Sequence, residues 1–145
     1  MKLKGYRGEI YFHILCPNRR LTYGDERLVE PGRELKARKV GQFPSKSKRP
    51  VLCEYGMHAC KDFNDTLRYR SASEGSWICL VRLNTEVIHD KNKSVALRRK
   101  VVAMRKFGDL FNDEYTTIDL TWMSNKIAND IVSSWILAKP YKGIK

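Results

Sequence analysis

The chain has 145 residues, of which 42% are hydrophobic and 30% charged. This composition is typical of one globular domain, so we expect residues 1–145 to fold as a single unit and exclude a disordered chain. No apolar run reaches the roughly 20 residues of a membrane helix, and no secretion signal follows the first lysines, so we expect no membrane partner and a cytoplasmic protein with reduced cysteines.

The charge is strongly positive. Lys and Arg number 28 against 16 Asp and Glu, a formal net charge of +12 at pH 7. An excess of this size attracts polyanions and speeds their encounter with the protein. Nucleic acid, a nucleotide-like ligand and an acidic protein surface are each compatible with it.

The first third of the chain predicts two strands. Residues 9–15 (EIYFHIL) are rich in β-branched and aromatic side chains and end at the turn signal Pro17-Asn18. The turn Pro31-Gly32 precedes residues 33–40, where Leu35 and Ala37 alternate with charged neighbours. That alternation indicates an edge strand, and the Pro- and Ser-rich residues 41–50 indicate a basic loop.

In the middle of the chain we expect a short strand at 51–53, a turn, and a helix over 63–70 that Asp62 caps. Residues 77–88 (WICLVRLNTEVI) form the strongest strand pattern, with Trp77, Cys79, Val81 and Leu83 on one face. Residues 94–104 fit a helix or a strand, and their three valines favour the strand.

The last third predicts an amphipathic helix. Thr116 and Asp119 have the spacing of a capping box. A helix over 119–138 would follow, its apolar face formed by Leu120, Met123, Ile127, Ile131 and Trp135. The order of elements predicts an α+β domain: a mixed or mainly antiparallel sheet, a short central helix and a C-terminal amphipathic helix.

The segment around Cys53, His58 and Cys60 was considered as a metal or catalytic site. Structural zinc sites use two close pairs of ligands, and here a fourth ligand would have to come from far away in the chain. His58 and Cys60 are two residues apart, a proximity that arises easily by chance and lacks any supporting catalytic motif. We therefore predict no metal, no catalytic residue and no cofactor, and expect buried cysteines in the core.

Basic clusters form the main candidate site. If residues 94–104 are a strand, Arg98 and Lys100 share one face, as Lys36 and Arg38 do in the earlier strand, and such ladders can bind phosphates. Tyrosines dispersed along the chain could stack on bases: Tyr6, Tyr11, Tyr23, Tyr55 and Tyr69. The predicted polyanion-binding residues are Arg19, Arg20, Lys36, Arg38, Lys46, Lys48, Arg49, Arg68, Arg70, Arg98, Lys100 and Arg105.

Residues 53–70 (CEYGMHACKDFNDTLRYR), with the segment from Ser76 to Ala103 (SWICLVRLNTEVIHDKNKSVALRRKVVA), resemble a family of small phage and prophage proteins of uncharacterised function. Its Cys-x-x-Gly-Leu/Phe-His-Ala signature matches here, with Met57 in place of Leu or Phe. The resemblance implies a phage-encoded protein that acts by binding, for example to inhibit a host antiviral defence.

A second resemblance is to ADP-ribosyltransferase-like folds, through His13, the Gly-x-His turn and the short helix with Tyr69. It implies that His13 would hold the ribose of a nicotinamide nucleotide and that Tyr69 would stack on a ring. The catalytic glutamate has no secure counterpart, so an enzyme or nucleotide-binding protein is an alternative only. His13, His58 and Tyr69 are the candidate pocket residues, with a structural role favoured for His58.

Our leading hypothesis is a basic, non-enzymatic binding protein. Its target would be nucleic acid, a nucleoprotein complex or a nucleotide signal, bound through phosphates. A protein–protein inhibitor of a host factor is the further alternative.

Overall fold

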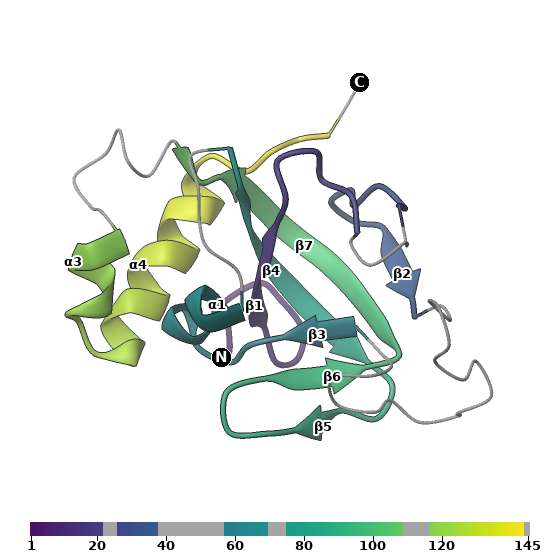
Figure 1. Ribbon diagram of the computed structural model, residues 1–145, viewed down its shortest axis with the longest axis horizontal. Coiled ribbons are helices and arrows are strands. Elements are labelled where there is room, and N and C mark those ends of the chain that lie inside the picture. Colours follow the sequence, from purple (N-terminus) through teal and green to yellow (C-terminus); the bar gives the residue numbers. More distant parts are fainter. Residues whose placement is uncertain (22–25, 38–56, 70–74, 109–116, 144–145) are drawn as a thin grey trace.

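Two antiparallel sheets form the framework of the protein (Figure 1). The computed structural model describes residues 1–21, 26–37, 57–69, 75–108 and 117–143. The larger sheet has the order β1-β4-β7-β2: β1 (Tyr11–Leu15), β4 (Trp77–Asn84), β7 (Arg98–Lys106) and β2 (Glu34–Lys36). The smaller sheet has the order β3-β6-β5: β3 (Met57–Ala59), β6 (Ser94–Ala96) and β5 (Ile88–His89).

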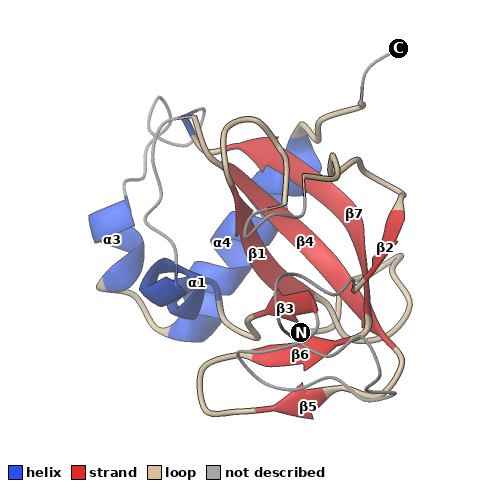
Figure 2. Ribbon diagram, turned by 45° about the vertical axis from the view of Figure 1, so that its right-hand side comes forward, coloured by secondary structure: helices blue, strands red, loops and turns tan. Residues whose placement is uncertain are grey.

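Three helices lie together on one side of the molecule, with β2 at the opposite side (Figures 1 and 2). They are α1 (Phe63–Tyr69), α3 (Thr117–Thr121) and α4 (Asn125–Ala138). The prediction of an α+β domain with antiparallel strands, a short central helix and a C-terminal amphipathic helix is confirmed.

Alternation along β4 builds a core on each face of the larger sheet. Trp77, Cys79 and Val81 face one core, together with Met57 and Ala59 of the smaller sheet. Ile78 and Leu80 face the other core, beneath α1 and α4. Since both faces are covered along most of β4, its side chains form the near-continuous apolar run that is typical of a buried strand. The predicted shared face of Trp77, Cys79, Val81 and Leu83 is confirmed.

The two strands predicted over 77–88 and 94–104 are shorter or divided in the structure. The strand expected over 77–88 ends at Asn84, and Thr85 has a positive φ of 75°, which turns the chain toward β5. The strand preferred for 94–104 is confirmed as β structure, but it divides at Leu97 into β6 and β7. Its two halves pair with different sheets, so no single strand can hold both.

A β-bulge divides β7 into two parts. Leu80 pairs with Ala103 and Val81 pairs with Val101, so Val102 is an extra residue with no partner in the register. An extra residue reverses which positions face each side of the sheet. Val101 and Met104 therefore share one core, whereas Ala103 lies in the core beneath the helices.

The helix expected over 119–138 is two helices. Ser124 begins α4, because its side chain accepts a hydrogen bond from the Ile127 amide in the N-cap geometry. The new start changes the buried face, so Ile127, expected in the core, is 52% exposed. The buried stripe contains Ala128, Val132 and Ile136. Thr116 of the expected capping box lies outside the described residues.

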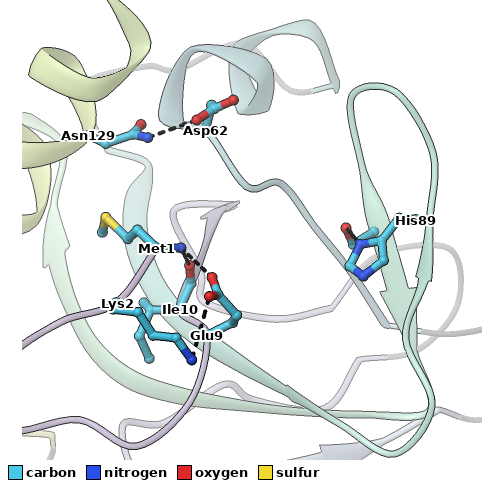
Figure 3. A network of polar contacts seen from close by, with 8 residues as sticks. Met1, Lys2, Glu9, Ile10, Asp62, His89 and Asn129 are labelled. Atoms are coloured by element: carbon cyan, nitrogen blue, oxygen red, sulfur yellow. Dashed lines mark hydrogen bonds and ion pairs between the residues drawn. The ribbon is translucent and has the colours of Figure 1, made fainter.

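A buried amide joins α1 to α4. Asn129, 7% exposed, accepts a hydrogen bond from the Phe63 amide through Oδ1 at 2.7 Å. Its Nδ2 donates to Asp62 Oδ1 at 2.8 Å (Figure 3). The carboxylate of Asp62, the residue predicted to cap α1, is thus held by α4. One side chain satisfies two groups at the start of α1 and fixes where the helix docks.

We expect Asn129→Ala to lower the free energy of unfolding by about 2–3 kcal/mol, because the buried Phe63 amide loses its acceptor. Urea denaturation followed by circular dichroism measures this loss. Ser134→Ala, at an exposed position of the same helix, is the matched control and should change stability by less than about 0.5 kcal/mol. Equal effects from the two substitutions would contradict the assigned role of Asn129.

Candidate polyanion-binding face

Six paired side chains occupy one face of the larger sheet at the end away from the helices. One row joins Lys36, Arg98 and Asn84, and the next joins Glu34, Lys100 and Arg82. Residues directly opposite each other in an antiparallel pair project to the same side. The two rows therefore form one continuous surface over β2, β7 and β4, which we call the basic face.

The other side of the same strands is core. Leu35, Arg99 and Leu83 form the row between the two rows of the basic face, and all three are buried. Lys36 and Arg98 are exposed, and Arg82 and Lys100 are half-buried. The period of two along β7 thus separates Arg98 and Lys100, which can meet a ligand, from Arg99, which cannot.

One carboxylate lies among the four cations of the basic face. Glu34 Oε2 is 3.6 Å from Arg98 Nη1, and Glu34 Oε1 accepts a hydrogen bond from the side-chain amide of Asn84. Exposed ion pairs of this kind contribute about 0–1 kcal/mol. The pair therefore orients Arg98 without neutralising the face, which keeps an excess of positive charge.

Four of the predicted basic residues serve local structure elsewhere. Arg19 pairs with Glu30 at 3.0 Å and covers the ring of Tyr141 at 4.8 Å. Arg20 donates to the Glu26 carbonyl at 2.9 Å.

The other two contact helices. Arg68 pairs with Asp65 of its own helix at 3.2 Å. Arg105 lies over the ring of Trp135 at 4.1 Å and donates to the carbonyl of that residue.

Of the predicted residues, the structure brings together Lys36, Arg98 and Lys100. Sequence reasoning missed Arg82, because a single arginine inside an apolar strand drew no attention. The signal was present: Arg82 lies between Val81 and Leu83, which were predicted to share one face of the strand, so Arg82 belongs to the other face. The remaining predicted positions lie outside the described residues: Arg38, Lys46, Lys48, Arg49 and Arg70.

The three candidate pocket residues, His13, His58 and Tyr69, do not form one pocket lining: two lie near Arg99, and Tyr69 makes a different contact. Arg99, 5% exposed, donates from Nη1 to the His58 carbonyl at 2.7 Å and lies 3.5 Å from His13 Nδ1. The structure thus brings His13 and the backbone of His58 together at a buried guanidinium. Tyr69 is at the end of α1, half-exposed, with its ring 4.9 Å from Lys93 Nζ. This contact uses the backbone carbonyl of His58, so the structural role favoured for its imidazole stays a prediction.

The described cysteines in strands belong to the core, as expected. Cys79 is fully buried, and burial raises the pKa of its thiol to about 12. Burial likewise raises the pKa of Cys60 to about 12. Both are neutral thiols near pH 7, whereas a nucleophilic cysteine reacts as the thiolate. Among the described residues, no group of three His, Cys, Asp or Glu side chains is placed to hold a metal ion; Cys53 lies outside them.

The fold and the basic face together define a small α+β protein with a cationic sheet surface. Residues 33–113, more than half of the chain, match the family described as a domain of unknown function (DUF7666), and the protein belongs to this family. The match includes all three strands of the basic face. No curated protein and no solved structure matches the chain. Over the described residues, none of the helices has the length and apolar character needed to span a membrane.

We expect Arg99→Ala to lower the free energy of unfolding by about 3 kcal/mol, because it removes a buried side chain and the hydrogen bond to His58. Arg98→Ala is the matched control, since the neighbouring arginine is exposed and should cost less than about 1 kcal/mol. Urea denaturation of both variants tests this difference. Losses of equal size would show that Arg99 does not join the two sheets.

Proposed function

We propose that the protein is a non-enzymatic nucleic-acid-binding protein that holds the phosphate backbone on its basic face. The observation that carries the proposal is the placement of Lys36, Arg98, Lys100 and Arg82 on adjacent strands of one sheet surface. Arg98 and Lys100 are neighbours on one face of β7, whereas Lys36 and Arg82 are distant in the sequence and join them only through strand pairing.

The spacing of the basic face suits a chain of phosphates. Positions two residues apart along a strand are separated by about 7 Å, and neighbouring strands by about 4.8 Å. Arg98 and Lys100 can thus reach successive phosphates while Lys36 and Arg82 flank them. Because paired strands hold the main chain of all four residues, binding need order only their side chains, which limits its entropic cost.

The net charge of +12 supports the same proposal at long range, because it raises the local concentration of any polyanion. The nucleic acid could be free or part of a nucleoprotein complex. We place this binding in the cytoplasm of a host cell, as the activity of a phage-encoded protein that modulates a host process.

Replacing Lys36, Arg98 and Lys100 together by Gln should weaken nucleic-acid binding at low salt by at least about tenfold. The dependence of log K on log salt should also lose about three units of slope, about one for each phosphate contact removed. Fluorescence anisotropy with a labelled oligonucleotide, titrated at several salt concentrations, measures both quantities.

The control for this variant replaces Lys126, Lys139 and Lys142 by Gln. These residues are exposed on α4 and the segment after it, and their loss changes the net charge by the same amount. The control should retain most of the affinity and the slope. An equal loss in both triple variants would attribute binding to net charge alone and reject the basic face as the site.

Glu34→Gln should act in the opposite direction and tighten binding about fivefold, since it removes the carboxylate that opposes phosphates on the face and releases Arg98. The substitution keeps an oxygen that can accept the Asn84 hydrogen bond. Asp130→Asn, at an exposed position of α4, removes the same charge away from the face and is the control. Weaker binding by the Glu34 variant would contradict the proposal, and a damaged fold cannot explain a gain.

A further inference from the structure

The chemistry of the basic face restricts the form of nucleic acid that it can bind. All six paired positions carry charged or amide side chains, and none carries an aromatic ring. Among the described residues, the large exposed apolar side chains lie elsewhere, at Tyr69 in α1, Trp122 after α3 and Ile127 in α4. Figures 1 and 2 show these helices at the side of the molecule opposite β2.

Sheet surfaces that bind single-stranded nucleic acid use rings as platforms for unstacked bases. Each base that stacks on an aromatic side chain contributes about 1–3 kcal/mol. The six residues of the basic face offer no such ring, so they provide no stacking platform for the bases of a single strand. Its affinity would come from phosphates alone.

Hydrogen-bonding groups for reading base edges are also restricted. Recognition of adenine by asparagine uses both the oxygen and the nitrogen of the amide. One N–H of the Asn84 amide already donates to Glu34, which holds the orientation of the amide, and Glu34 is also paired with Arg98. The neutral and the acidic side chain of the face thus contact each other, and the other four side chains of the face are cations that can meet phosphate oxygens.

Binding through phosphates favours the form with the higher charge density. A duplex presents about one phosphate per 1.7 Å of its length and holds a denser layer of counterions than a single strand. The same cations therefore release more counterions on a duplex, with a slope of about −0.9 per contact against about −0.7 on a single strand.

We propose that the basic face binds the backbone of duplex nucleic acid without reading its sequence. This inference rests on the proposed function, because it names the form of nucleic acid that the same surface takes. Arg98 and Lys100 contact phosphates along one strand of the duplex, and Lys36 and Arg82 extend the contact on either side. Arg99 has no part in binding, since it faces the core.

The test compares three labelled probes by fluorescence anisotropy on the full chain: two duplexes of about 20 base pairs with unrelated sequences, and oligo(dT) of the same length. We expect both duplexes to bind within about twofold of each other and about fivefold or more tighter than oligo(dT). With four phosphate contacts, the salt slope on the duplex should be about −3.6.

Two variants distinguish a failure of the duplex inference from a failure of the proposed function. Trp122→Ala, at a residue 85% exposed, should leave all three affinities unchanged, because no base stacks there. Tighter binding of oligo(dT), a tenfold preference between duplexes, or a loss with Trp122→Ala would overturn this inference. If one of these results were found and the Lys36, Arg98 and Lys100 triple variant still lost binding, the proposed function would stand and only the duplex inference would be wrong. No binding of any probe would overturn both.

Discussion

The pleat of β7 divides three consecutive basic residues between the two faces of one sheet. Arg98 and Lys100 project to the surface, and Arg99 projects into the core between the sheets. This division follows from the two-residue period of a strand, and pairing with β2 and β4 fixes it on both sides. The sequence Arg-Arg-Lys thus supplies the centre of the basic face and the polar link within the core.

The link made by Arg99 explains how the smaller sheet is held. Strand β3 has three residues and contributes Met57 and Ala59 to the shared core, a small apolar area on which to dock. The hydrogen bond from Arg99 to the His58 carbonyl adds a directional contact between the sheets. A charged donor in a buried site makes a stronger hydrogen bond than a neutral one, and its long stem also packs against apolar neighbours.

The sequence predicted most of the fold because its signals were local. Alternation around Cys79 and the three- and four-residue spacing of apolar residues from Leu120 to Trp135 indicate a strand and a helix without knowledge of the tertiary structure. The boundaries were less accurate where a tertiary choice decided them. Leu97 divides β6 from β7 because the two halves join different sheets, and Ser124 restarts the helix and rotates its buried face.

The candidate site was predictable in part for the same reason. The shared face of Arg98 and Lys100 follows from alternation alone, but their alignment with Lys36 and Arg82 depends on strand order and register. Those are long-range properties that a single sequence does not encode in any short pattern. Four other arginines were grouped with the site by charge, and the structure shows that each makes local contacts: Arg19, Arg20, Arg68 and Arg105.

The extra residue at Val102 has a consequence for how this chain can vary. It allows the exposed cations of one half of β7 and the helix-covered Ala103 of the other half to lie on the same side of the sheet. Loss of one residue between Arg99 and Met104 would remove the bulge and restore a regular two-residue alternation along β7. Either the cations or the core side chains would then project to the opposite side of the sheet. The two faces of the sheet therefore fix the number of residues in this segment.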